Sequence, residues 1–145
     1  GVDGAIHRAA GPELLEECWD LAPCFPGSCV VTKPYRLPCG CIIHTVAPHW
    51  RGGGANEIAV LKSCYQSALD IAQDKGLKSI AFPCIGVGAF GIPHELAAHT
   101  AIGAVQNHLY DGEVIFCCFT AVDKKIYDAI LRIGKESTVT SGLHW

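Results

Sequence analysis

The sequence predicts an α/β domain in which helices cover a sheet, and three observations lead to this fold class. Apolar runs with β-branched residues alternate with longer segments of helical period. Half of the 145 residues are apolar, enough to bury a substantial core. No internal repeat or linker divides the chain. We therefore predict one domain over residues 1–135 and a tail over residues 136–145.

Four strands are predicted where β-branched and aromatic residues favour a pleated, half-buried surface. They cover residues 28–33 (SCVVTK), 41–46 (CIIHTV), 79–83 (SIAFP) and 114–119 (VIFCCF). The segment after residue 135 has no clear period, so a further strand over 138–140 is only a weak prediction.

Five helices are predicted around these strands, over residues 2–10, 13–21, 57–74, 93–109 and 123–133. Gly76 follows the third helix and Pro93 opens the fourth, at positions that helix ends favour. One face of the third helix is apolar, and we expect it to lie in the core. It consists of Ile58, Leu61, Tyr65, Leu69 and Ala72.

Charge and hydropathy exclude two classes of partner. The formal net charge of -3 lacks the basic excess that gives proteins general affinity for a phosphate backbone. No stretch approaches the roughly 18 uninterrupted apolar residues of a membrane span, and no basic region followed by an apolar run opens the chain. We expect an intracellular protein that binds neither nucleic acid nor a membrane.

The nine cysteines are expected to be reduced thiols, because their number is odd and the core does not need disulfide cross-links for stability. This places the protein in the cytoplasm, nucleus or mitochondrial matrix. Metal binding is the alternative, with Cys39-x-Cys41 and His44, or Cys117 and Cys118, as ligands. Neither group has the two spaced ligand pairs of a structural zinc site, so no metal is expected.

The first segment that carries chemistry is GVDGAIHRAAG, residues 1–11. Within a helix, Asp3 and His7 share a face. An acid there can serve chemistry, or it can simply stabilise the start of the helix. Spacing alone leaves both interpretations open.

The second segment is PCIGVGAFGIP, residues 83–93, which runs from a strand through three glycines into a helix. Glycines at such a turn let backbone N–H groups approach phosphate oxygens, and the helix N-terminus adds positive charge. The alternative is a flexible turn. Phe90 favours a ligand-binding loop, because an aromatic among glycines has few core neighbours.

Together the two segments resemble the macrodomain family. The segments LPCGCIIHTVAPHW, SCYQSALDIAQDKGLKSIAFP and VIFCCF are similar to it as well, so the resemblance covers roughly residues 1–131. It implies a three-layer α/β/α fold with a mixed central sheet, whose usual N-terminal strands are missing from this chain. ADP-ribose lies across the crest of the sheet in this family, at the strand ends.

The resemblance also implies the site residues. Gly1, Val2 and Asp3 match the loop beside the diphosphate and distal ribose. The phosphate-wrapping loop matches Ile85, Gly86, Val87, Gly88, Ala89, Phe90 and Gly91, with Phe90 against the distal ribose. Phe119 matches an aromatic position near the adenine, although core packing explains it equally well.

The hydrolase branch of the family implies an activity. There Asp3 matches the acid that activates or orients a water, and His7 a supporting histidine. The substrates implied are ADP-ribosylated proteins and O-acetyl-ADP-ribose, with no cofactor. The alternatives are a reader that binds ADP-ribose or its polymer without turnover, and an interaction domain without ligand.

The sequence departs from the family in two places. The family's strand ending in Asn-Ala-Ala-Asn before the first segment is absent, and we expect an incomplete N-terminus and an open sheet edge. Gly86 and Val87 replace a frequent Ser-Thr, and Phe90 replaces a frequent tyrosine. Hydroxyl groups are lost there, while backbone donors for phosphate remain.

Overall fold

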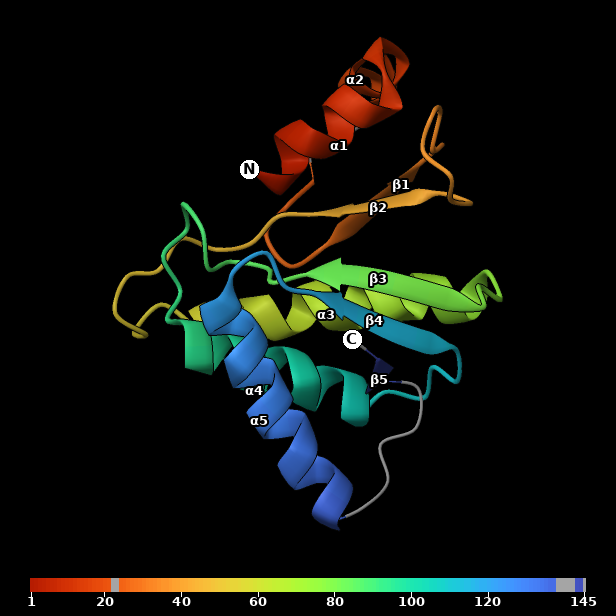
Figure 1. Ribbon diagram of the computed structural model, residues 1–145. Coiled ribbons are helices and arrows are strands. Elements are labelled where there is room, and N and C mark those ends of the chain that lie inside the picture. The colour runs from red at the N-terminus through yellow and green to blue at the C-terminus, as the bar shows by residue number, and fades with distance from the viewer. Residues whose placement is uncertain (22–23, 138–142, 145) are drawn as a thin grey trace.

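The computed structural model describes residues 1–21, 24–137 and 143–144. In these ranges the helices are α1 (Val2–Ala10), α2 (Pro12–Asp20), α3 (Glu57–Asp74), α4 (His94–Gln106) and α5 (Ala121–Ser137). The strands are β1 (Cys29–Thr32), β2 (Ile42–Thr45), β3 (Ser79–Pro83), β4 (Glu113–Cys117) and β5 (Leu143–His144) (Figure 1). The weak strand predicted over 138–140 lies outside the described residues.

The strands pair in both senses, as expected for a mixed sheet, but the described residues form two sheets rather than one. β1 and β2 are antiparallel, with Val31 opposite Ile43. β3, β4 and β5 are parallel in that order, and Phe82 lies opposite Phe116. No described hydrogen-bond ladder joins β1 or β2 to β3.

Successive residues of β2 point to opposite faces and so join two cores. Ile42 packs with Ala10 and Leu14 of α1 and α2, which lie on one side of the β1–β2 sheet. Ile43, the next residue, packs against the larger core that α3 contributes to from the other side. This part of the chain therefore has the three layers that the family resemblance implies.

The larger core lies between β3 and β4 on one side and α3, α4 and α5 on the other. The rings of Tyr65, Phe82, Phe116 and Tyr127 form a continuous row, with successive centroids 4.9, 6.1 and 5.2 Å apart. The predicted apolar face of α3 is confirmed. Leu61, Tyr65, Leu69 and Ala72 are buried, and Ile58 packs against them.

Several predicted element ends are wrong by a few residues, for reasons that lie in their surroundings. β4 stops at Cys117 because its partner β3 stops at Pro83. Helix α5 starts at Ala121 rather than 123, where Thr120 Oγ1 accepts the Asp123 N–H at 3.2 Å. Helix α4 ends at Gln106, and α2 begins at Pro12. Within the described ranges, no helix has the length and apolarity needed to cross a bilayer.

Candidate functional site

The segments singled out from the sequence gather at one end of the molecule. Since β3 and β4 are parallel, their carboxyl ends lie at the same edge, and the chain leaves them toward residues 84–93 and 118–120. Figure 1 shows the amino end of α1 at this same side of the molecule. The fold thus brings the predicted ribose, phosphate and adenine segments to one edge.

Asp3 and His7 face each other on α1. Asp3 Oδ1 lies 3.6 Å from His7 Nε2, and the side chains are 86% and 25% exposed respectively. Gly1 is the N-cap residue, and Asp3 forms no capping hydrogen bond with a described residue. Its carboxylate is therefore open to a ligand or water, while His7 is held closer to the protein.

His44 lies on the face of the β1–β2 sheet that α1 covers. The sequence indicated it only as a candidate metal ligand. Thr32 Oγ1 and His44 Nε2 lie 2.8 Å apart. Burial lowers the pKa of His44; the negative charge of Asp3 opposes that shift and His7 adds to it. The charges of Asp3 and His7 therefore act on the His44 ring.

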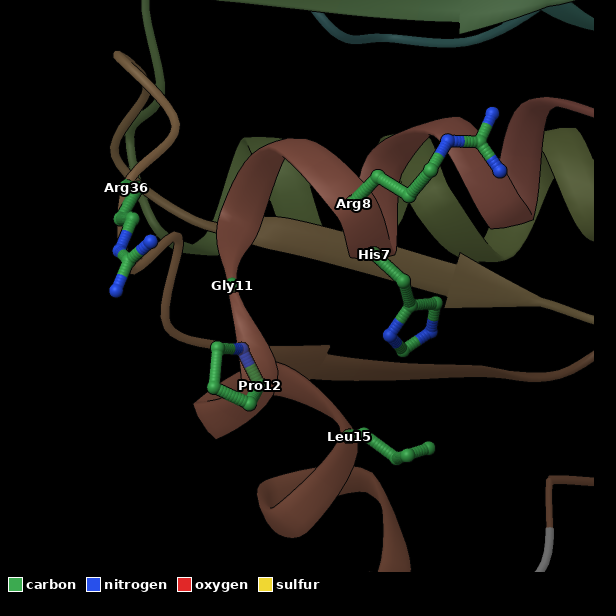
Figure 2. A pocket seen from close by; sticks show the side chains of 6 residues that line it. All are labelled: His7, Arg8, Gly11, Pro12, Leu15 and Arg36. Carbon is green, nitrogen blue, oxygen red and sulfur yellow. The ribbon is translucent and has the colours of Figure 1, made fainter.

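A shallow hollow adjoins His7 (Figure 2). Its lining comes from α1, α2 and the segment before β2, and consists of His7, Arg8, Gly11, Pro12, Leu15 and Arg36. In Figure 2 the His7 ring is turned toward Leu15, while the guanidinium of Arg8 points away along α1. The backbone N–H of Arg36 donates to Ala10 O at 3.2 Å, which ties this segment to the end of α1.

Residues 84–93, called here the glycine loop, close on themselves. Ile92 N–H donates to Gly86 O at 2.9 Å, and Gly91 N–H donates to Gly88 O at 3.1 Å. Gly86 has φ +87°, and a Cβ at this position would lie 2.6 Å from Cδ1 of the buried Ile92. Glycine is required at Gly86 by both its backbone and its neighbour.

The outer part of the glycine loop presents free donors. The backbone N–H groups of Gly86, Val87, Gly88, Ala89 and Phe90 have no acceptor among the described residues. Buried or half-buried N–H groups are normally paired, and Gly86, Val87 and Phe90 are half-buried, while Gly88 and Ala89 are exposed. The run of five donors can therefore bind an external acceptor. The first turn of α4, immediately after the loop, adds the positive end of a helix dipole.

Three residues that support the loop were missed as site residues. The Tyr65 Oη accepts the Ile85 N–H at 3.2 Å, and the Trp50 N–H donates to Phe90 O at 2.8 Å. The rings of His49 and Phe90 pack with centroids 4.4 Å apart. Phe90 therefore does have an aromatic neighbour, contrary to the expectation from its glycine-rich surroundings. The aromatic pair before the Gly52–Gly54 run was the available signal.

Glu57 holds the segment that carries His49 and Trp50. Its buried carboxylate accepts the N–H groups of Arg51, Gly53 and Ala55 at 2.8, 2.9 and 2.7 Å. The hydrogen bonds from Arg51 and Gly53 lower the pKa of Glu57 to about 2, against the effect of burial. This charged carboxylate thus holds the segment whose His49 and Trp50 contact Phe90 of the glycine loop.

Phe119 lies beyond the end of β4 and is 96% exposed. Core packing, the alternative that the sequence left open, is therefore wrong. An exposed aromatic beyond a strand end can stack on a planar ligand.

The metal candidates are dispersed. His44 is engaged by Thr32, and Cys39 and Cys117 are exposed. Among the described residues, no three His, Cys, Asp or Glu side chains lie close enough together to hold a metal ion.

The fold is that of an α/β domain, and the predicted ligand segments follow the carboxyl ends of its parallel strands. Comparison with known proteins then gives the family. The model of the Macro domain family matches residues 1–101, and the chain belongs to that family.

Three relatives illustrate the range of names in the family. The chain is 48% identical over 133 residues to a macro domain-containing protein of Ralstonia nicotianae, across 91% of this chain and 78% of that protein. It is 41% identical over 139 residues to the O-acetyl-ADP-ribose deacetylase of Citrobacter rodentium, across 90% and 78%. It is 46% identical over 134 residues to the ADP-ribose glycohydrolase MACROD2 of Mus musculus, across 88% of this chain and 28% of that protein.

Solved structures agree on the fold. The Oceanobacillus iheyensis macrodomain with ADP superposes with a TM-score of 0.90 and 36% identity, covering 95% of this chain and 78% of that one. The Trypanosoma brucei macrodomain in complex with ADP-ribose gives a TM-score of 0.79 and 39% identity, covering 90% and 56%.

Proposed function

We propose that this chain binds ADP-ribose and hydrolyses ester-linked groups at its distal ribose. One observation carries the proposal: the free N–H groups of Gly86–Phe90 lie at the same side of the molecule as the amino end of α1, the helix that carries the exposed carboxylate of Asp3. The first suits a diphosphate, and the second suits a water beside it. Related structures hold ADP or ADP-ribose, which supports the choice of ligand.

In the proposed complex the diphosphate lies against the glycine loop. Its negative charge is stabilised by the loop N–H groups and by the amino end of α4. Phe119 stacks on the adenine, and Phe90 faces the distal ribose. Gly1 and Val2 at the start of α1 complete the ribose end, next to Asp3.

Asp3 is the proposed general base. Its carboxylate takes a proton from a water, whose oxygen attacks the ester at the distal ribose. The ester C–O bond breaks, the proton held by Asp3 passes to the departing ribose oxygen, and the products are the free ribose hydroxyl and the released acid. His7, 3.6 Å from Asp3, orients the carboxylate. Holding the ribose by its diphosphate keeps the ester within reach of that water.

Two esters fit this chemistry. Relatives bear the names O-acetyl-ADP-ribose deacetylase and ADP-ribose glycohydrolase, so both an acetyl ester and an ADP-ribosylated acidic side chain are candidate substrates. Both are hydrolysed at the same ribose, and the residues at the site do not rank them.

The proposal is tested with Asp3→Ala. We expect turnover of ADP-ribosylated protein and of O-acetyl-ADP-ribose to fall by about 10²–10⁴-fold, as for loss of a general base. The exposed Asp3 makes no hydrogen bond to a described residue, so Tm should be unchanged. Titration calorimetry with ADP-ribose measures binding, and release assays measure turnover. The control is Asp20→Ala, which removes an exposed acid of α2.

Parent-like rates in Asp3→Ala would refute the role of Asp3. If the parent chain binds ADP-ribose but hydrolyses neither O-acetyl-ADP-ribose nor ADP-ribosylated protein, it is a reader of ADP-ribose. No binding by the folded chain would exclude both functions.

A further inference from the structure

A buried carboxylate joins the two segments that the proposed function assigns to the ligand. Asp123 of α5 is 3% exposed, and its Oδ1 lies 2.6 Å from Nδ1 of His94. A carboxylate only accepts hydrogen bonds, so the His94 proton lies on Nδ1. The His94 side chain itself is 44% exposed. Loss of this donor would leave a buried carboxylate oxygen without a partner, which destabilises the folded state.

The cap of α5 sets the orientation of Asp123. The hydroxyl of Thr120 donates to Asp123 Oδ2 at 3.1 Å and accepts the Asp123 N–H at 3.2 Å. One carboxylate oxygen is thereby used by the start of its own helix. The other is presented to His94.

The His94–Asp123 pair connects the end of the glycine loop to the segment that carries Phe119. His94 is the first residue of α4, two residues after the buried Ile92 that closes the glycine loop. Asp123 comes four residues after the exposed Phe119. The thiols of Cys84 and Cys118, where the chain leaves β3 and β4, also lie 3.7 Å apart. The two segments thus touch both where they start and where they end.

We infer that His94 and Asp123 are a positioning pair, which keeps the glycine loop and Phe119 at the separation that one ADP-ribose spans. The inference rests on the proposed function. Neither residue is placed in contact with the reacting atoms, so the pair should govern affinity rather than the chemical step.

The chain supplies a matched control at the opposite end of α4. His108 Nε2 lies 2.6 Å from Asp70 Oδ1, the same length as in the first pair, but the Asp70 side chain is 68% exposed. His108 follows Gln106, the last residue of a helix about 20 Å long. This second pair joins the far end of α4 to α3, away from both ligand segments.

The test compares His94→Ala, His94→Asn and His108→Ala in calorimetric titration with ADP-ribose and in turnover. His94→Ala should raise Kd and KM by about tenfold, as for one lost hydrogen bond to a charged group, and leave kcat unchanged. His94→Asn should recover most of the affinity, because its amide keeps a donor at the same reach. His108→Ala should lower Tm and leave Kd unchanged. An unchanged Kd in His94→Ala, or an equal rise in His108→Ala, would overturn the inference.

Amide hydrogen exchange without ligand separates this inference from the proposed function. Exchange of the hydrogen-bonded amides of Ile85, Gly91 and Ile92 should quicken in His94→Ala and remain at the parent rate in His108→Ala. If the parent chain fails to bind ADP-ribose, the proposed function is lost, and this exchange result still decides whether the pair holds the two segments. Unchanged exchange in His94→Ala would refute the pair's role.

Discussion

At the scale of single residues, Glu57 shows how one buried charge supports the site. Three backbone N–H groups satisfy its carboxylate, and they belong to the segment that follows His49 and Trp50. His49 packs on the Phe90 ring, and Trp50 donates a hydrogen bond to the Phe90 carbonyl. A substitution at Glu57 should therefore affect the glycine loop indirectly, through His49 and Trp50.

Glu57→Gln should alter the dependence of stability on pH. The pKa of Glu57 falls from 4.5 to about 2 on folding, so the charged carboxylate stabilises the native state above pH 4.5. That contribution is lost as pH drops from 4.5 toward about 2. The glutamine variant has no such proton to bind. We expect it to be less stable than the parent at pH 7, by several degrees in Tm, with a flatter loss of stability in acid.

Urea unfolding at pH 7, 4 and 3 measures this effect. Glu16→Gln is the control, since Glu16 is an exposed acid of α2. If the parent and Glu57→Gln lose stability in parallel below pH 4.5, the native pKa of Glu57 is not lowered.

At the scale of elements, the glycine loop depends on where its glycines stand. Gly86→Ala places a Cβ 2.6 Å from Ile92 Cδ1 at a backbone with φ +87°. Positive φ and overpacking together should cost about 1–3 kcal/mol. A Cβ at Gly88 would meet no described atom within 4 Å, and φ is not positive there, so Gly88→Ala should leave stability unchanged.

Thermal unfolding and ADP-ribose titration compare these two alanine variants. We expect weaker binding in Gly86→Ala, because displacing Ile92 disturbs the five donors that precede it. Equal Tm and Kd for the two variants would show that the loop adapts to a side chain at Gly86.

At the scale of the whole molecule, the described residues bury two clusters of unequal size. The smaller consists of Ala10, Leu14 and Ile42, and it fastens α1 and α2 to β2. The larger joins α3, α4, α5, β3 and β4. Because few buried contacts hold α1 and α2, they should open at a lower free energy than the rest of the domain.

Leu14→Ala should cost about 2–5 kcal/mol within the smaller cluster. We expect amide exchange to rise in α1 and α2 while α4 keeps its protection, and turnover to fall because α1 carries Asp3. The control is Leu69→Ala in the larger cluster, which should raise exchange in α3 and α4. A uniform rise across the domain in Leu14→Ala would mean that the two clusters unfold together.

Much of the site follows from local rules. The pairing of Asp3 with His7 was predictable because residues four apart on a helix always share a face. The glycine loop was predictable because glycines between a strand and a helix indicate an unusual backbone, here positive φ at Gly86 and Gly91. The Thr120-x-x-Asp123 pattern was visible as a helix start, and using it would have corrected the first residue of α5.

The remainder depends on residues far apart in the chain. The end of β4 is set by where β3 ends, and no property of residues 114–119 records that. The exposure of Phe119 and the contact of His49 with Phe90 follow from how strands and loops are arranged around them. His94 and Asp123, 29 residues apart, meet only because α4 packs beside α5.

Local sequence was enough to predict the fold class, the family resemblance and the two segments that the proposed function assigns to the ligand, because helical period, β-branched runs and glycine positions act over a few neighbouring residues. Tertiary packing was needed to establish which backbone donors stay free, that Phe119 is exposed and that His94 meets Asp123. Each of these is a property of partners from distant parts of the chain, and such partners meet only when the whole domain has folded.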